Sequence, residues 1–240
     1  DTRAVIGAWQ DRDNGPSSGS AYLFDATTGQ QIAKLLPGDV GQGDRFGFSV
    51  AINGTTAVIG AQTSRNNGVR TGSAYLFNST TGQQISKLLP SDGAAVGGFG
   101  CSVSISGTTA VIGVNGDDDN AIGSGSAYVF DTTTGQQIVK LLPIDGAAFD
   151  EFGNSVAISG NTAVVGATGD DDNGSDSGSA YVFDTSTGQQ IAKLLPSDGT
   201  AGDRFGWSVA ISGTTALIGA SQQDSNGIRS GSAYLFDTTT

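Results

Sequence analysis

The sequence predicts an all-β chain built from five copies of one unit, and three observations lead to this prediction. Equivalent positions, occupied by Val5, Val58, Val111, Val164 and Leu217, recur every 53 residues without an insertion in any copy. Each copy holds short apolar segments that are joined by tight turns rich in Gly, Asn and Ser. Glycine accounts for 38 of the 240 residues and proline for only 5, which favours turns and close packing over disorder. A fixed period of this length is typical of solenoids and propellers.

Four strands are expected in each complete copy, and the second copy illustrates them. The first strand covers Phe46–Ile52 (FGFSVAI), and an Asn-Gly hairpin turn leads to the second, Thr56–Ala61 (TAVIGA). The third covers Gly72–Phe77 (GSAYLF), and the fourth covers Gln83–Pro90 (QQISKLLP). Because the connections are short, neighbouring strands are predicted to be antiparallel.

The residue pattern also predicts the order of strands within a sheet. The second strand is apolar at successive positions, as a strand buried on both faces should be. The fourth strand carries a charge in every copy, namely Lys34, Lys87, Lys140 or Lys193, and ends at a proline. Lys and Pro protect an exposed edge from pairing with another chain, so this strand is predicted to be outermost. Small residues in the first strand suit the crowded inner position.

Repeated four-stranded antiparallel sheets of this kind predict a β-propeller, with each sheet forming one blade. A parallel β-helix is the alternative, but its coils are shorter and lack such hairpin turns. The chain starts at a second strand and stops after a third, so the first and last blades are incomplete and eighteen strands are expected. We expect one propeller domain over residues 1–240, either a five-bladed ring or an excerpt of a larger ring. Because the first residue is Asp1, we favour part of a longer protein.

Composition excludes several classes of function. The chain has no His and a single cysteine, Cys101, which excludes Ser-His-Asp and Cys-His units, His-ligated metals and cysteine zinc clusters. A net charge of -12 argues against a nucleic-acid partner. No apolar run approaches the roughly 20 residues that a membrane helix needs, so no membrane insertion is expected. A glycosidase needs one carboxylic acid with a pKa raised by burial, whereas the acids here are adjacent on predicted loops. We therefore expect no enzyme.

Three segments of each copy carry a family resemblance. FGxSVA in the first strand, VIGA at the end of the second and GSAYLF in the third resemble the FG-GAP repeat of integrin α-subunit propellers and of many bacterial extracellular proteins. The resemblance covers the whole chain and recurs five times. It implies a propeller, usually seven-bladed, that is extracellular or at the cell surface and binds a protein or carbohydrate partner in adhesion.

The family resemblance also implies a calcium site, which this sequence does not match. Family members often bind calcium in the loop between the first and second strands. In the second copy that loop is Asn53-Gly54-Thr55, and none of the equivalent loops contains a carboxylate. Calcium needs six to eight oxygen ligands, usually including several carboxylates. The usual calcium site of the family is therefore not expected here.

The long connections, which follow the second and fourth strands, are predicted to share one side of the blades, which we call the long-loop face. They hold 18 of the 23 acidic residues. Functional residues concentrate on loops held by a rigid scaffold, so we expect partner binding on this face. The candidate partner-binding residues are Trp9, Asp11, Arg12, Asp13, Arg65, Arg70, Asp117, Asp118, Asp119, Asp224 and Arg229. The alternatives are loops that only keep the chain soluble, and a structural or assembly module without a ligand.

Further candidate sites lie in the same loops. Asp170, Asp172 and Asp176 present oxygens at alternate positions, as a calcium-binding loop does, so they are candidate ligands for Ca²⁺; a solvated acidic loop is the alternative. Trp207 varies between copies and is expected to pack rather than to bind a sugar. A recurring Asn predicts a turn with positive φ; it occurs at Asn14, Asn67, Asn120, Asn173 and Asn226. The incomplete terminal blades predict self-association through their open edges.

Overall fold

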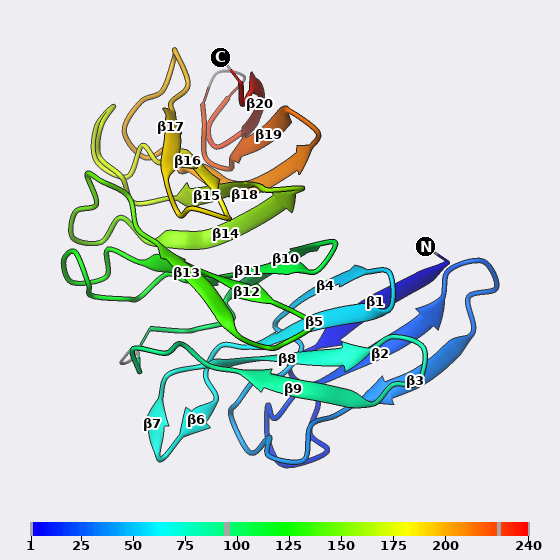
Figure 1. The fold of residues 1–240 in the computed structure, drawn as a ribbon. Helices are drawn as coiled ribbons and strands as arrows, with labels where there is room; N and C mark the ends of the chain where they lie inside the picture. The colour runs from blue at the N-terminus through cyan, green and yellow to red at the C-terminus, as the bar shows by residue number, and fades with distance from the viewer. Residues whose placement is uncertain (1, 94–96, 225–226, 240) are drawn as a thin grey trace.

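A computed structural model describes residues 2–93, 97–224 and 227–239 of the chain. Within these ranges every regular element is a β-strand, as Figure 1 shows. The same ranges contain no helix that is long and apolar enough to cross a membrane. The predicted all-β class is therefore confirmed.

The strands form five sheets that follow the predicted copies. The first three-stranded sheet contains β1 (Arg3–Ala8), β2 (Ser20–Asp25) and β3 (Gln31–Leu35). The second sheet contains β4 (Ser49–Asn53), β5 (Thr56–Ala61), β8 (Ser73–Asn78) and β9 (Gln84–Leu88). The third contains β10 (Ser102–Ser106), β11 (Thr109–Val114), β12 (Ser126–Asp131) and β13 (Gln137–Leu141). The fourth contains β14 (Phe152–Ser159), β15 (Thr162–Ala167), β16 (Ser179–Asp184) and β17 (Gln190–Leu194). The fifth contains β18 (Phe205–Ser212), β19 (Thr215–Ala220) and β20 (Ser232–Asp237).

Strand order within the sheets agrees with the sequence prediction. Every neighbouring pair is antiparallel, and each complete sheet runs in chain order from its first strand to its fourth. All eighteen predicted strands are present among the described residues. Two further strands, β6 (Arg65–Asn66) and β7 (Val69–Arg70), form a small hairpin in the second sheet's long loop. The Asn67-Gly68 turn that joins them has φ of 52° and 84°, so the predicted positive-φ turn is confirmed there. At Asn14 and Asn173 the positive φ belongs to the following glycine rather than to the Asn, and Asn120 does not have a positive φ. The equivalent Asn226 lies outside the described residues.

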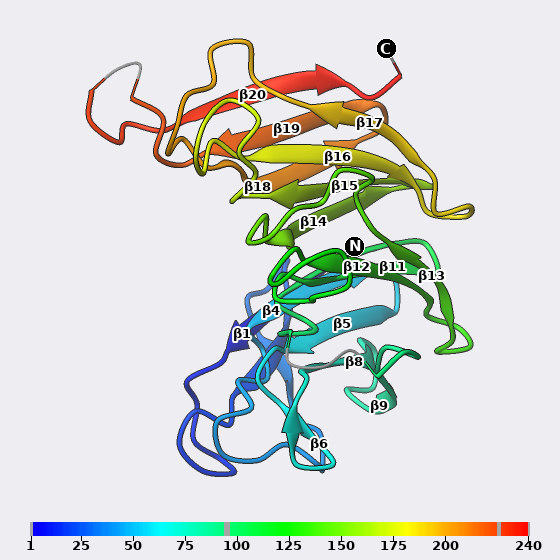
Figure 2. The same ribbon diagram turned by 90° about the vertical axis from the view of Figure 1, so that its left-hand side faces the viewer.

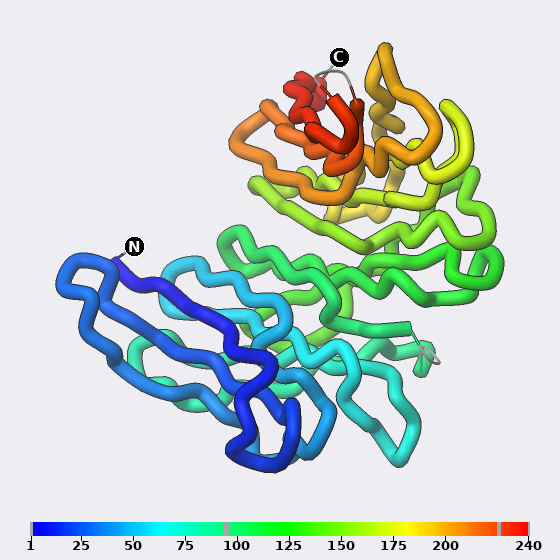
Figure 3. Tube along the Cα trace, turned by 180° about the vertical axis from the view of Figure 1, so that it is seen from behind, coloured from blue at the N-terminus to red at the C-terminus, as the bar shows by residue number. Residues whose placement is uncertain are grey.

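The five sheets pack as successive blades, but they form an open arc rather than a closed ring. Figures 1 and 3 place the first sheet at one end of the arc and the fifth at the other, and Figure 2 shows the sheets stacked in chain order. The first strands of the second to fifth blades, β4, β10, β14 and β18, lie next to one another. The first strand is therefore the inner one, as its small residues predicted. A closed five-bladed ring is not observed.

Close packing between blades explains the residues that define each repeat. Phe46 is fully buried and meets Tyr75 and Phe77 edge to face, with ring centroids 5.4 and 5.8 Å apart. A Cβ on Gly60 would lie 2.0 Å from the carbonyl oxygen of Gly100 in the next blade, so no larger residue fits there. The Ser49 hydroxyl donates a 2.8 Å hydrogen bond to the same carbonyl. Equivalent contacts recur in the later blades.

The two ends of the arc expose apolar side chains that are buried inside it. Leu235 on β20 is 71% exposed and Leu217 on β19 is 44% exposed, whereas the equivalent Leu76 and Val58 are fully buried in the second blade. At the opposite end, Ile6 on β1 is 53% exposed, whereas the equivalent Ile59 is buried. Each end therefore presents one half of the contact that joins neighbouring blades.

Candidate functional site

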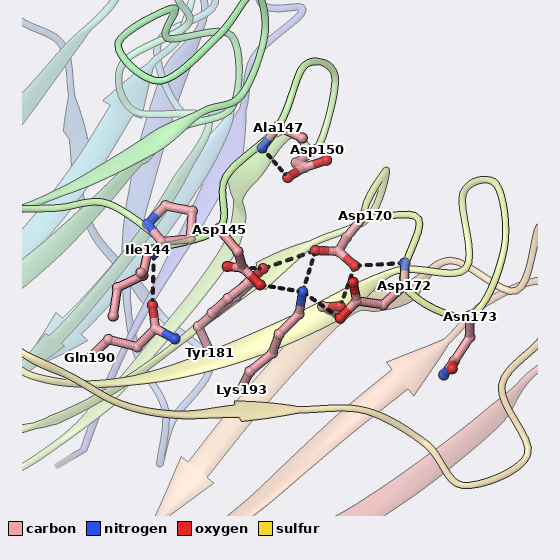
Figure 4. Close-up of polar contacts among 12 residues, drawn as sticks. Ile144, Asp145, Ala147, Asp150, Asp170, Asp172, Asn173, Tyr181, Gln190 and Lys193 are labelled. Atoms are coloured by element: carbon pink, nitrogen blue, oxygen red, sulfur yellow. Dashed lines mark hydrogen bonds and ion pairs between the residues drawn. The ribbon is translucent and has the colours of Figure 1, made fainter.

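Each lysine of the outer strand binds acidic residues of the long-loop face, and we call this arrangement a lysine cluster. In the fourth blade, the Lys193 Nζ lies 2.7 Å from Asp145, 2.8 Å from Asp170 and 2.7 Å from Asp172 (Figure 4). Asp145 belongs to the connection that enters the blade, and the other two acids belong to the loop between β15 and β16. One ammonium group therefore ties two long loops to the outer strand.

Asp170 is the buried member of this cluster, and two neutral hydroxyl groups also donate hydrogen bonds to it. Ser179 and Tyr181 donate hydrogen bonds of 2.8 and 2.9 Å to the Asp170 carboxylate. Asp170 itself is only 3% exposed. Burial acts to raise the pKa of Asp170, but hydrogen bonds from Lys193, Ser179 and Tyr181 outweigh it and hold the pKa below its usual value. The same carboxylates raise the pKa of Lys193 above its usual value against the opposing effect of burial. Asp170 and Lys193 are therefore both ionised at neutral pH.

The arrangement recurs in the first and third blades. In the third, the Lys140 Nζ lies 2.9 Å from Asp92 and from Asp117 and 2.5 Å from Asp119. In the first, Lys34 binds Asp11 at 3.0 Å and also binds Asp13. A Ser and a Tyr again donate to the buried or half-buried acid in each case. The lysine also lies over the ring of that Tyr, with 4.8 to 5.2 Å to the centroid.

The lysine clusters change the interpretation of the outer strand. The prediction that this strand is outermost is confirmed, but its lysines do not act as solvated edge charges. Their side chains are only 14% exposed in Lys140 and 15% in Lys193, because the carboxylates and the Tyr ring cover them. The joint recurrence of Lys, Tyr and two Asp residues at the 53-residue period was the available sequence signal.

The second blade departs from this pattern. Ser64 and Asn66 replace the two loop acids, so Lys87 keeps a single ion pair, 2.7 Å from Asp39, among the described residues. Ser64 instead donates a 2.6 Å hydrogen bond to Ser73, and Asn66 turns inward to Thr71 and Gly72. This is also the blade whose loop forms the β6–β7 hairpin.

A second group of acidic residues accepts hydrogen bonds from backbone N–H groups of the same loop. Asp118 accepts a 2.7 Å hydrogen bond from the backbone N–H of Gly123, and Asp171 accepts one of 2.8 Å from Asp176. Asp224 accepts the equivalent bond from the backbone of Arg229. The first and second blades carry Arg12 and Arg65 at this position. A turn-closing role therefore accounts for several of the acids that distinguish one blade from another.

The repeats match a known family over most of their length. The model of the FG-GAP repeat matches residues 1–24, 30–77, 83–130, 136–183 and 189–236. The chain belongs to the FG-GAP repeat family. A comparison with curated proteins finds no match. Each matched FG-GAP segment ends at the third strand of a blade, so the lysine clusters join residues of successive matched segments.

The candidate partner-binding residues of this FG-GAP chain occupy one face but do not form one patch. Asp11, Asp13, Asp117 and Asp119 are engaged in lysine clusters, whereas the side chains of Arg12, Arg65, Arg70 and Asp118 are exposed. Asp224 and Arg229 are exposed on the fifth blade. Trp9 is half-buried: Arg45 lies 5.1 Å from its ring and Phe48 contacts it edge to face. Trp207 is 48% exposed, with Arg204 over its ring. Binding by these residues stays a prediction.

The candidate calcium ligands are brought together only in part. Carboxylate oxygens of Asp145, Asp170 and Asp172 lie within 4.8 Å of one another, and the Lys193 ammonium contacts all three. Asp145 was missed at the sequence level because it lies on a different connection. Asp176 is not part of this group. It has a φ of 54°, and its backbone N–H donates a hydrogen bond to the Asp171 carboxylate within the loop. Calcium binding by Asp170, Asp172 and Asp176 stays a prediction.

The second FG-GAP blade carries a cavity on the long-loop face. It has a volume of about 400 Å³ and lies between the β6–β7 loop and the connection that leaves β9. Its lining combines apolar and amide groups, namely Asn66, Asn67, Val69, Thr71, Leu89, Pro90 and Gly93. Val69 is 47% exposed and Leu89 is 41% exposed. Sequence reasoning missed this cavity because it depends on how the hairpin folds over the neighbouring connection.

Proposed function

We propose that this FG-GAP chain is an extracellular binding or adhesion module that uses its long-loop face to contact a protein or carbohydrate partner. The observation that carries this proposal is the contrast between a constant scaffold and variable loops. Blade-to-blade packing repeats almost unchanged, whereas the second blade presents Arg65, Asn66 and Arg70 where the fourth presents Asp171, Asp172 and Asp176. Variation confined to loops on a rigid scaffold is typical of recognition surfaces. The extracellular location rests on the family resemblance.

The second blade offers the most suitable contact region on that face. Its cavity of about 400 Å³ has an apolar wall of Val69, Leu89 and Pro90 with amide groups at Asn66 and Asn67. Recognition sites commonly combine an apolar wall with a few polar groups that fix orientation. Arg65 and Arg70, on the strands β6 and β7 of the same hairpin, are exposed. We therefore place the centre of the proposed contact at the second blade.

Catalysis is not part of the proposed function. The long-loop acids described above are held by lysines or by backbone N–H groups, which suits fixed loops better than proton transfer. Cys101 is buried, and burial raises the pKa of its thiol to about 11, so it is a poor nucleophile at neutral pH.

Binding to an array of defined glycans and a panel of purified extracellular proteins tests the proposed function. Wild type would be compared with Arg65→Gln/Arg70→Gln and with Asp171→Asn/Asp176→Asn, which keep the hydrogen-bonding geometry of the loops. We expect at least one ligand that binds wild type and loses affinity when the arginines are removed. Binding that is absent in wild type, or equal in all three proteins, would reject the proposal.

A structural or assembly module is the second candidate, and the exposed ends of the arc favour it. Leu217 and Leu235 at one end and Ile6 at the other correspond to the two sides of the internal blade contact. Large exposed apolar faces favour association. A second copy of the chain could therefore stack its first blade on the fifth blade, extending the arc head to tail.

A further inference from the structure

A second open cavity lies on the long-loop face, at the junction where the second blade meets the third. Its volume is about 300 Å³. Val69 lines the cavity described above and Arg70 lines this one; they are successive residues of β7, so their side chains point to opposite sides of the strand. The residues of the second cavity that carry the argument are Gln62, Thr63, Arg70, Gly97, Gly98 and Asn115.

Two glycines, Gly97 and Gly98, line this cavity at positions where the other junctions carry charged residues. The equivalent pairs are Asp44-Arg45, Asp150-Glu151 and Asp203-Arg204. The backbone contact is the same, because the Gly116 N–H donates a 3.0 Å hydrogen bond to the Gly97 carbonyl, as the Gly169 N–H does to Asp150. Loss of the two side chains, rather than a different backbone, therefore leaves this space open.

At two other junctions, the residue equivalent to Gly98 covers the junction with its side chain. Arg45 lies 5.1 Å from the ring of Trp9, which follows β1 of the first blade. Glu151 accepts a 2.9 Å hydrogen bond from the hydroxyl of Thr168, which follows β15 of the fourth blade. Gly98 has no side chain to make either contact, so the polar residues on both sides of it are open to a ligand.

The polar groups of the cavity suit a sugar ring that carries a carboxylate. Gln62 and Asn115 offer amide groups, and each amide has both donors and an acceptor for sugar hydroxyl groups. Arg70 is exposed and makes no ion pair with the described residues. A guanidinium group matches a planar carboxylate with two parallel hydrogen bonds. Asp117, the next acid along the chain, is already paired with Lys140 at 2.9 Å.

We propose that this cavity binds one hexuronate residue of an acidic carbohydrate, with the carboxylate on Arg70 and the hydroxyl groups on Gln62 and Asn115. The inference rests on the proposed function, because it names the ligand class for the long-loop face at the second blade. A volume of about 300 Å³ is at the lower end of the range for small-molecule sites, so it suits a single ring. The carboxylate of an acidic side chain would leave most of it unfilled. Gly97 and Gly98 let the ring approach the backbone closely.

Ligand-observed NMR and calorimetry on the full chain test the ligand class. The probes are the methyl glycosides of galacturonate, glucuronate and mannuronate, each with its neutral methyl ester as the matched control. We expect at least one uronoside to bind in a saturable way and its ester to bind at least about tenfold more weakly, because the ester lacks the charge. Acetate and N-acetylglutamate amide test the carboxylate by itself. Equal binding of the ester or of either small carboxylate, or no binding of any uronoside, would overturn the proposal.

Three substitutions locate the site within the chain. Arg70→Gln should weaken uronoside binding at least about tenfold. Arg65→Gln is the matched control, because Arg65 is exposed on the same hairpin but donates to the Gly68 carbonyl at 3.2 Å and does not line the cavity. Gly98→Glu restores the side chain of Glu151, which has a φ of 56° against 76° for Gly98, so it should fold and abolish binding. Equal affinity in wild type, Arg70→Gln and Gly98→Glu, or an equal loss in both arginine variants, would overturn the proposal.

The same measurements distinguish this inference from the proposed function. A protein or neutral glycan that binds through the loop of residues 62–71, together with no binding of any uronoside, would overturn the hexuronate site and leave the proposed function in place. Absence of every ligand would overturn both.

Discussion

Removal of the lysine from the fourth blade should destabilise the protein far more than the same substitution in the second blade. Lys193→Met keeps the apolar stem that covers Tyr181 but removes the charge shared by Asp145, Asp170 and Asp172. Breaking a buried ion pair costs about 3–5 kcal/mol, because the remaining charge stays desolvated. The Asp170 side chain is only 5% exposed, so this cost applies to it.

The other two carboxylates contribute less, and the second blade provides the control. The side chains of Asp145 and Asp172 are 46% and 48% exposed, and exposed pairs are worth about 0–1 kcal/mol each. We therefore expect Lys193→Met to lower the free energy of unfolding by about 3 kcal/mol. Lys87→Met removes only the pair with Asp39, whose side chain is 49% exposed, so its loss should stay below about 1 kcal/mol. The lysine Nζ lies at a similar distance from the centroid of a Tyr ring in both blades, 5.2 and 5.3 Å.

Urea denaturation, followed by tryptophan fluorescence and circular dichroism, measures both variants. Lys140→Met should resemble Lys193→Met, because Lys140 also serves three carboxylates. The pKa of Asp170 lies below its usual value of 3.8, so the stability that its ionised form contributes is present above that pH and is lost as the pH falls further. The deficit of Lys193→Met should therefore shrink in acid. Equal losses at Lys193 and Lys87, or a loss below about 1 kcal/mol at Lys193, would refute the reasoning.

Four other predictions follow from particular contacts. Millimolar calcium should raise the melting temperature of Lys193→Met but not of Lys87→Met, because the Lys193 substitution leaves three carboxylates within 4.8 Å of one another and the Lys87 substitution does not. An equal response of the two variants would contradict calcium binding by this group. The hydroxyl of Ser86 on β9 is buried and has no partner among the described residues, and the equivalent residues Ala33, Val139 and Ala192 are all apolar. Ser86→Ala should therefore stabilise the protein by about 1 kcal/mol in urea denaturation, and a loss of stability would contradict this. Burial raises the pKa of Asp150 to about 6, so its contribution to stability is greatest below pH 4 and is lost as the pH rises through 6. Asp150→Asn keeps an acceptor for the Ala147 N–H and should be about 1–3 kcal/mol more stable than wild type at pH 7, with no gain at pH 4; a gain that is the same at both pH values would argue against a charge effect. Light scattering should show concentration-dependent association of wild type that Leu235→Lys reduces, and a wild-type chain that stays monomeric at every concentration would count against head-to-tail stacking.

The sequence was sufficient to predict the scaffold because each repeat combines local signals that agree. Apolar runs such as TAVIGA, hairpin turns at Asn-Gly or Ser-Gly, and a lysine followed by a proline fix strand identity and order. The β6–β7 hairpin was missed, because Arg65-Asn66 and Val69-Arg70 are too short and too polar to be recognised as strands. Their pairing depends on the turn at Asn67-Gly68.

The site was harder to predict because its contacts cross between connections. Asp145 meets Asp170 and Lys193 only after the blade has folded, and the sequence separates Asp145 from Lys193 by 48 residues. The periodic lysines were assigned to edge protection, which is correct for their position but not for their contacts. Alignment of the five copies by chemistry, rather than by hydrophobicity, would have shown that Lys, Tyr, Ser and Asp recur together in the first, third and fourth blades.

An exchange of loops tests most directly whether the variable loops of the long-loop face determine binding. Residues 62–71 of the second blade would be replaced by the equivalent residues 168–177 of the fourth, which fit the same Ser, Tyr and Lys donors. Surface plasmon resonance would then compare the exchanged protein with wild type against each ligand found on the glycan array or protein panel. We predict that the exchanged protein folds with unchanged or higher stability and loses the ligand. Retention of the ligand at wild-type affinity by the folded exchanged protein would contradict the claim that this loop forms the binding surface.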